Sequence, residues 1–355
     1  MDTIKGLQYP LGKDFVPDAG QFHEVAPGVH WLHMPLPYAL NRINLWLLED
    51  GDGWTIVDTG LDLPESKAIW ESAEQGIMQG RPVKRVIVTH LHPDHVGLAG
   101  WLTERHGCPL YMSRQEFLMC RNLVQDTGKP APQMALDFFH AAGYSEEQIE
   151  SYRQRFGSFG TEIAPLPDSY RRLQDGEVLE INDQYWQVVV GSGHSPEHAC
   201  LYCPALKLLI AGDQVLPGIS PNVSVFPTEP DGDPLNEWLL SCHRLRNNLP
   251  GNVLVLPAHQ QPFYGLHVRL SQLIESHERS LDRLLEFLEE PRTAIECFSP
   301  LFRRNLKGFQ AQLGIGEALA HLNCLIGRRQ ISREMGADRV NRYQRLAEAS
   351  DPAEA

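Results

Sequence analysis

The stretch Thr89-His90-Leu91-His92-Pro93-Asp94-His95 carries the strongest structural signal in this chain. It places three imidazoles and one carboxylate between positions 90 and 95, after the apolar run Val86-Ile87-Val88. Packed histidines and a buried carboxylate without compensation would be costly, so few uses other than cation binding fit this pattern. We therefore predict a strand that ends in a tight loop able to hold two metal ions.

The size and charge of the chain limit the classes of protein to which it can belong. With 355 residues, 42% of them hydrophobic, it can build one large domain, or one domain and a smaller appendage. Its formal net charge of -14 argues against a general nucleic-acid binder, because phosphate contacts need clustered Lys and Arg.

The cysteines and the N-terminus bear on the compartment. The seven cysteines are scattered, and Cys200 and Cys203 form a close pair without the second such pair that a zinc knuckle needs. Residues 1–20 lack a basic start followed by an apolar run, and no window approaches the ~20 apolar residues of a membrane span. We expect reduced thiols, a cytoplasmic location and no membrane partner; the sequence sets no oligomeric state.

Short apolar runs bounded by turn residues predict strands in both halves of residues 1–265. The turn residues 49–53 predict a hairpin, and helices are expected at 64–79 and 97–106. Two sheets packed face to face with helices outside would satisfy these elements, which makes a four-layer αββα sandwich of the α/β class. The strand candidates are 29–33, 43–48, 54–57, 86–88, 178–181, 185–190, 199–202, 208–211 and 253–256.

Two regions lack this alternation of short apolar runs and turn residues. Residues 113–160 are polar and helical in character, which predicts a helical insertion that either covers apolar surface or forms a substrate lid. Residues 266–355 begin with leucines at helical spacing up to Pro291 and end in a turn-broken stretch near Gly336. We therefore expect a catalytic domain over 1–265 and a small helical or winged-helix-like region over 266–355.

Three isolated polar residues behind the histidine cluster share one property. His194, Asp213 and His259 each follow an apolar strand candidate and lie next to or near Gly or Pro. Asp58 ends the strand 54–57 in the same manner. Taken singly, each is weak evidence, because an Asp after Gly is usually a turn residue. Their order behind the cluster makes the set specific.

The whole set resembles the metallo-β-lactamase fold superfamily, and in particular its two-metal, glyoxalase II-like branch. The resemblance covers roughly residues 20–265. It implies one metal held by His90, His92 and His194, and a second held by Asp94, His95 and His259, with Asp213 bridging the two. It also implies that Asp58 is an orienting carboxylate behind the metals, although a plain turn residue is the alternative.

The chemistry of the donors supports two Zn(II) ions per chain and tolerates Fe or Mn. Imidazole nitrogen and carboxylate oxygen without thiolate suit these metals. A carboxylate can hold two cations about 3.5 Å apart, and a hydroxide between them is a nucleophile at neutral pH. Asp94 could orient that hydroxide, and Asp58 could orient the metal ligands from behind. These two residues are therefore the catalytic candidates.

Two positions differ from the patterns of other branches of the superfamily and so limit the branches to which the chain can belong. The best-known β-lactamases have Cys at the position of Asp213, and flavodiiron oxidoreductases have Glu at the position of His92, so both are disfavoured. Single-iron persulfide dioxygenases use overlapping ligands and stay open. A basic glutathione patch like that of glyoxalase II has no clear match here.

Candidate substrate contacts are less specific. His198 lies in His-Ser-Pro-Glu-His and is a candidate substrate contact; the alternatives are a role that supports the ligands from behind and a direct metal ligand. The proline-stiffened loop 216–234 follows Asp213 and is either one pocket wall, with Ile219 and Phe226 as apolar contacts, or plain surface.

The C-terminal segment 301–345 is basic, with nine Lys or Arg against three acidic residues. It resembles the winged-helix-like appendage of a branch that mixes nucleases with hydrolases of unknown substrate. Either it is a solvated face, or it contacts a CoA-like phosphate or RNA.

For the protein as a whole, we expect a hydrolase of a small-molecule thioester, lactone or ester. The alternatives are a metal-dependent phosphodiesterase or endoribonuclease, or an iron-dependent persulfide dioxygenase-like enzyme. The nine basic residues of segment 301–345 are Arg303, Arg304, Lys307, Arg328, Arg329, Arg333, Arg339, Arg342 and Arg345.

Overall fold

A computed structural model describes residues 2–302, 306 and 308–347, which fall into two compact units. The first unit consists of residues 1–129, 156–221 and 241–272. The second consists of residues 130–155, 222–240 and 273–355. Each unit is therefore built from segments that are distant in the sequence, and α7 (Pro234–Asn248) and α8 (Leu266–Phe287) contribute residues to both.

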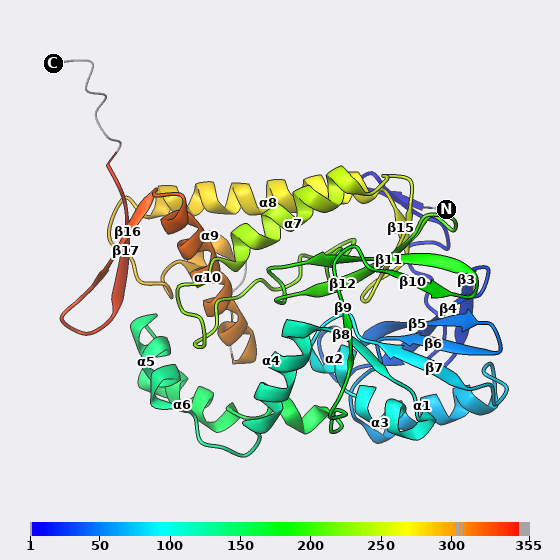
Figure 1. The fold of residues 1–355 in the computed structure, drawn as a ribbon. Helices are drawn as coiled ribbons and strands as arrows, with labels where there is room; N and C mark the ends of the chain where they lie inside the picture. The colour runs from blue at the N-terminus through cyan, green and yellow to red at the C-terminus, as the bar shows by residue number, and fades with distance from the viewer. Residues whose placement is uncertain (1, 303–305, 307, 348–355) are drawn as a thin grey trace. The chain divides into compact units, whose positions relative to one another are not determined.

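Seven strands form one sheet of the first unit, and Figure 1 shows β5, β6 and β7 side by side in blue. Neighbouring strands from β6 to β9 pair in parallel, while those from β3 to β6 form an antiparallel meander. In order across the sheet, the strands are β3 (Phe22–Ala26), β4 (Val29–Pro35), β5 (Arg42–Asp50), β6 (Gly53–Val57), β7 (Val83–Ile87), β8 (Leu110–Ser113) and β9 (Arg171–Leu173).

Eight strands form the second sheet of the same unit. β13 pairs with β14 in parallel, and β12 is antiparallel to both β11 and β13, so β11, β13 and β14 run in one direction. In order across the sheet, the strands are β1 (Asp2–Ile4), β2 (Leu7–Tyr9), β15 (Phe263–Tyr264), β14 (Leu254–Pro257), β13 (Leu208–Gly212), β12 (His198–Cys203), β11 (Gln184–Gly191) and β10 (Val178–Ile181).

The alternation along β5 shows how the layers are held together. Successive side chains of a strand point to opposite faces. Ile43, Leu45 and Leu47 belong to a buried core shared with helix residues such as Trp70. Residues of the opposite face, such as Trp46, belong to a second core that includes strands of both sheets. The sheets therefore pack face to face, which confirms the predicted sandwich.

Helices cover the outer faces of the sheets. Those on the first sheet are α1 (Pro64–Gln75), α2 (Pro93–Val96), α3 (Ala99–His106) and α4 (Arg114–Gln125), with the short η1 (Phe159–Glu162) nearby. On the second sheet lie residues 241–248 of α7 and 266–272 of α8 (Figure 1). Ser241 Oγ accepts a hydrogen bond from Ser192 N, and Arg269 donates to the carbonyl of Leu216.

The described residues of the second unit form helices, connecting loops and an antiparallel hairpin. Within it, the Tyr144 hydroxyl, in the turn between α5 and α6, donates to the Ala311 carbonyl of α10 at 3.1 Å. Helices followed by a two-stranded hairpin match the expected winged-helix-like region. The complete elements are α5 (Gln133–Ala141), α6 (Glu146–Arg155), α9 (Phe298–Leu301), α10 (Phe309–Gly327), β16 (Ile331–Met335) and β17 (Asn341–Arg345).

Two helix boundaries differ from the expectation. The helix predicted at 64–79 ends at Gln75, because Gly76 follows and Gln79 and Gly80 adopt positive φ. The helix predicted at 97–106 is α3, which follows the one-turn helix α2 that starts at Pro93. Proline is favoured at the first helical position, and this places Asp94 and His95 on a turn rather than in extended backbone.

Candidate metal centre

Four strands of the first unit end at one place. β7 leads into the loop with His90, His92, Asp94 and His95, and β11 leads into the loop with His194. β13 and β14 are parallel neighbours that lead to Asp213 and His259. β11, β13 and β14 run in one direction and so end at the same edge of the second sheet, and the loop after β7 of the first sheet meets them there.

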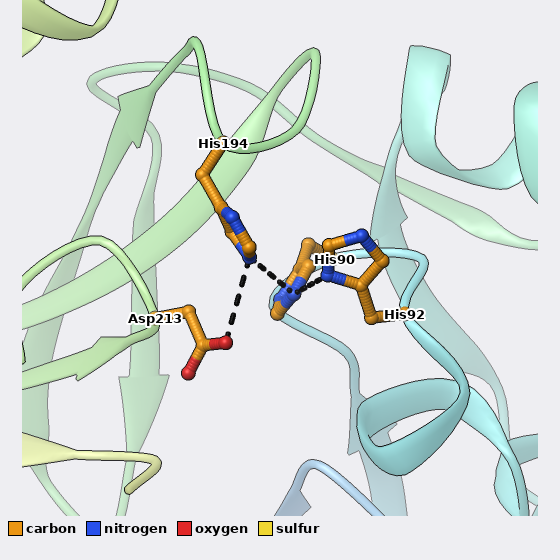
Figure 2. Close-up of side chains that lie close together, drawn as sticks. All are labelled: His90, His92, His194 and Asp213. Atoms are coloured by element: carbon orange, nitrogen blue, oxygen red, sulfur yellow. Dashed lines mark hydrogen bonds and ion pairs between the residues drawn. The ribbon is translucent and has the colours of Figure 1, made fainter. Parts of the chain in front are cut away.

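The first donor group consists of His90, His92, His194 and Asp213. Figure 2 shows the four side chains pointing toward one another from three separate segments. His90 Nε2 lies 2.8 Å from His92 Nδ1 and 3.2 Å from His194 Nε2. His194 Nε2 lies 3.4 Å from Asp213 Oδ2. All four donor atoms are within 4.8 Å of one another, which is close enough to surround one ion.

The second donor group consists of Asp94, His95 and His259. Asp94 Oδ2 lies 3.3 Å from His259 Nε2 and 3.8 Å from His95 Nε2. Asp213 faces this group as well, with Oδ1 3.5 Å from His259 Nε2 and Oδ2 3.7 Å from His95 Nε2. The two oxygens of one carboxylate therefore point toward both groups.

Buried polar atoms show that the residues fit bound cations. Asp213 Oδ1 and His95 Nε2 are buried and have no hydrogen-bond partner among the described residues. An unpartnered polar atom inside a protein is costly, and metal coordination would remove that cost. The donors are imidazole nitrogens and carboxylate oxygens without thiolate, a set that suits Zn(II), Fe or Mn.

The electrostatics of the cluster also call for positive charge. Burial lowers the pKa of His90 well below its usual value and that of His92 to about 3, so both imidazoles are neutral. Burial opposes charge on His95 too, but the carboxylates of Asp58, Asp94 and Asp213 raise the pKa of His95 well above its usual value. His90 and His92 are thus in the neutral form that metal binding requires, while the carboxylates around His95 favour a positive charge that a bound cation would supply.

Asp58 combines an uncommon backbone conformation with a fully bonded carboxylate. Its φ is 61°, which is uncommon for a residue other than Gly. One carboxylate oxygen accepts from Thr89 N at 2.8 Å, and the other accepts from Thr89 Oγ1 at 2.9 Å and lies 2.8 Å from His95 Nδ1. Asp58 thus fixes the His95 ring so that Nε2 faces the donor groups.

His198 lies behind the cluster rather than on its open side. Its ring is fully buried and stacks on that of His90, with centroids 4.7 Å apart. Its Nε2 accepts a hydrogen bond from Asp213 N at 3.1 Å. The prediction of a substrate contact is corrected here, because a buried ring with this bond has no surface to offer. His198 instead supports the Asp213 backbone.

The predicted apolar wall divides between the two units. Ile219 is half-buried in the first unit, where buried Arg269 donates to its carbonyl at 2.7 Å. Phe226 belongs to the second unit and is 45% exposed. Both remain predictions as substrate contacts.

Sequence reasoning missed two buried polar residues that hold the donor loops. Asn44 on β5 donates to the carbonyls of Pro257 and Gln260 at 2.8 and 2.6 Å, on either side of His259. Glu116 in the first turn of α4 accepts from the backbone of two donor loops. A polar residue on the apolar face of a strand or helix was the one signal available for either residue.

Among the described residues, we find no helix with the length and apolar character needed to cross a bilayer. The seven cysteines are all free thiols, and six of them are buried.

Solved structures resemble the chain over almost its whole length. A beta-lactamase domain protein from Burkholderia ambifaria is 39% identical with a TM-score of 0.88, over 96% of this chain and 98% of its own. A metallo-beta-lactamase family protein from Thermus thermophilus is 30% identical with a TM-score of 0.76, over 91% of this chain and 100% of its own.

Curated relatives are more distant. The probable metallo-hydrolase YqjP of Bacillus subtilis is 23% identical over 83% of this chain and 91% of its own. Human acyl-coenzyme A thioesterase MBLAC2 is 25% identical over 66% of this chain and 79% of its own. A linear primary-alkylsulfatase from a Pseudomonas strain is 26% identical over 62% of this chain, and the match spans 42% of its own length.

Two family models match the sequence. The C-terminal domain model of metallo-beta-lactamase-like proteins matches residues 281–346. The model of the metallo-beta-lactamase superfamily matches residues 39–290, which include both donor groups and Asp58. The chain therefore belongs to the metallo-beta-lactamase superfamily.

Proposed function

We propose that this protein is a binuclear metallo-hydrolase that cleaves a small-molecule acyl substrate, a thioester or a lactone or other ester. The observation that carries the proposal is the position of Asp213, whose Oδ2 faces His194 and whose Oδ1 faces His259. A carboxylate shared between two sets of imidazoles is suited to hold two cations at the short separation of two-metal hydrolases.

Each donor has a proposed place. His90, His92 and His194 would hold one metal, Asp94, His95 and His259 the other, and Asp213 both. Two Zn(II) ions are the proposed cofactors, with Fe or Mn as the metals that the same donors tolerate. When bound, such ions supply Lewis acidity toward a carbonyl oxygen and lower the pKa of water.

The residues of the chain prepare that chemistry. Asp58 and His198 fix His95 and the Asp213 backbone, so the donor atoms are positioned before a substrate arrives. The Asp94 side chain is 18% exposed, against 1% for Asp58. Asp94 is therefore the carboxylate that can accept a hydrogen bond from an incoming water, and we propose it as the catalytic carboxylate, with Asp58 acting through His95.

The proposed substrate class rests on the activity of one relative and on the ion pairs of the basic segment 301–345. MBLAC2 is an acyl-coenzyme A thioesterase, which supports a thioester here. An RNA substrate is disfavoured because acids already pair with arginines of the basic segment. Arg328 pairs with Glu278 at 2.7 Å, Arg333 with Asp231 at 2.9 Å and Arg342 with Asp338 at 2.7 Å. Arg303, Arg304 and Lys307 of that segment lie outside the described residues.

The proposed metal donors all lie in the N-terminal part of the chain. Residues 1–265 contain all the proposed donors, and none comes from the described residues of the C-terminal region, 266–355. The seven unpaired cysteines support a reducing compartment, and we propose the cytoplasm.

The test combines metal content with a substrate panel. Protein is purified, its metal is measured, and it is stripped with a chelator and reloaded with Zn(II). Acyl-CoA thioesters, lactones, an alkyl sulfate and RNA are then assayed over a range of salt. We expect two metals per chain, and thioester or lactone hydrolysis that stripping abolishes and zinc restores.

Other outcomes would overturn the proposal. Hydrolysis of RNA alone, with salt-dependent binding, would replace it with a phosphodiesterase. One iron per chain with no acyl hydrolysis would replace it with the oxidative alternative. Undiminished hydrolysis by metal-free protein would remove the metal mechanism.

A further inference from the structure

The carboxylate of Glu116 is fully buried in the first turn of α4 and is not one of the proposed metal donors. Its Oε2 accepts a hydrogen bond from Leu91 N at 2.9 Å, and its Oε1 accepts one from Glu197 N at 2.7 Å. Leu91 lies between His90 and His92, and Glu197 lies between His194 and His198. One side chain therefore bonds the backbones of two donor loops.

We propose that Glu116 is a positioning residue that fixes the loop of His90 and His92 against the loop of His194. This inference rests on the proposed metal site and extends it. The three imidazoles joined in this way are those of the first donor group, whereas Asp94, His95 and His259 belong to the second. Loss of the Glu116 carboxylate should therefore weaken one metal position more than the other.

The start of α4 adds further bonds to the same loop. Ser113 Oγ donates to the Glu197 carbonyl at 2.7 Å, and Gln115 N donates to Glu197 Oε2 at 2.9 Å. These bonds hold the Glu197 backbone beside α4, but neither reaches the loop of His90 and His92. Of the bonds at this helix end, those of Glu116 are the ones that join both loops.

A carboxylate has the acceptors that this position requires. Each of its two oxygens accepts a hydrogen bond from a backbone N–H. In Glu116→Gln one oxygen becomes an NH₂ group, which would point a donor at a donor. In Glu116→Asp the side chain is one methylene shorter and cannot reach both N–H groups from the same helix. Neither change touches a metal donor.

Asp50 provides a matched control in the same unit. Its carboxylate is also buried and joins separate segments, accepting from Thr55 Oγ1 at 2.8 Å, Arg85 Nη2 at 3.0 Å and Asn182 N at 3.3 Å. None of these partners lies in a donor loop. Asp50→Asn therefore removes a buried carboxylate whose hydrogen-bond partners lie outside the donor loops.

The experiment measures zinc binding rather than turnover. Full-length wild type, E116Q, E116D and D50N are stripped of metal and titrated with Zn(II) against a chromophoric chelator. The unfolding free energy of each metal-free protein is measured in denaturant. The visible spectrum of the Co(II)-loaded protein reports the coordination geometry.

We expect wild type to bind two zinc ions and E116Q to bind one of them about 10- to 100-fold more weakly, with the other nearly unchanged. E116D should lie between wild type and E116Q, and the Co(II) spectrum should change in both. D50N should lose stability while keeping both zinc affinities.

Wild-type affinity for both ions in E116Q would overturn the role of Glu116 alone. Equal weakening in D50N would also overturn it, since the effect would then be a general loss of stability. A wild-type chain that binds no zinc would overturn the metal site itself, and this inference with it.

Discussion

Two clusters of buried histidines in this chain differ in the carboxylates that surround them. In the first unit, the metal-site histidines converge from strand ends together with Asp58, Asp94 and Asp213. In the second unit, the helix pair consists of His277 on α8 and His321 on α10, with His277 Nδ1 3.4 Å from His321 Nε2.

The carboxylates account for the difference between the clusters. Burial lowers the pKa of His277 to about 3 and that of His321 to about 4, so both rings of the helix pair are neutral. At His259 burial acts in the same direction, but Asp213 and Asp94 outweigh it and raise the pKa. The two neutral rings of the helix pair therefore make a packing contact, whereas the imidazoles with converging carboxylates make a place for cations.

The largest expected effect comes from removing the shared carboxylate. Asp213→Asn should lower acyl hydrolysis by about 10³-fold or more, because both donor groups lose their common anion. Metal content should fall from two ions to at most one. The control His321→Asn should keep both ions. Steady-state kinetics with metal analysis measures this, and wild-type rates from D213N would refute the bridging role.

Removal of the carboxylate behind His95 should have a smaller effect. Asp58→Asn leaves every donor in place but loses the bonds that orient His95 and Thr89. Zinc affinity should fall about 10- to 100-fold, as measured by chelator competition. Unchanged affinity would show that the loop itself, not Asp58, fixes His95.

The helix pair should make the protein sensitive to acid. In the unfolded chain both rings titrate near 6.5, but in the fold they stay neutral down to about 4, so the unfolded state binds more protons between these values. Stability therefore falls as pH decreases from about 6.5 to 4. His321→Asn should reduce this loss by about 1–2 kcal/mol.

The measurement is the pH dependence of denaturant unfolding for metal-free wild type and His321→Asn. The metal-site histidines contribute equally to both proteins and cancel in the difference. If the unfolding free energies of the two proteins changed in parallel with pH, the pKa of His321 would not be lowered in the folded state.

The smallest effect concerns Glu317, whose carboxylate accepts from Asn222 Nδ2 at 3.2 Å. Burial raises its pKa from 4.5 to about 7, so the folded state keeps a proton that the unfolded state releases. Stability contributed by this group is present below pH 4.5 and is lost as pH rises to 7. Glu317→Gln should gain about 1 kcal/mol at pH 8 and nothing at pH 4.5. A gain of equal size at both values would contradict the assigned pKa.

Much of the fold could be predicted because its signals are local. The alternation in β5 and the turn residues 51–52 are set by neighbouring residues, and the predicted strands and hairpin appear there. β1 and β9 were missed because each is only three residues long and depends on a distant partner. The helix predicted at 64–79 was too long because glycine at 76 ends α1.

The kinds of donor and the strands that carry them follow from the sequence, because each motif comes after a short apolar run typical of a buried strand. The tertiary structure alone decided which atoms face one another. It placed His198 behind Asp213 rather than beside a substrate, and it brought Asn44 and Glu116 to loops far away in the sequence. The physical reason is that a buried hydrogen bond depends on spatial proximity, and the packing of the two sheets and their helices sets that proximity.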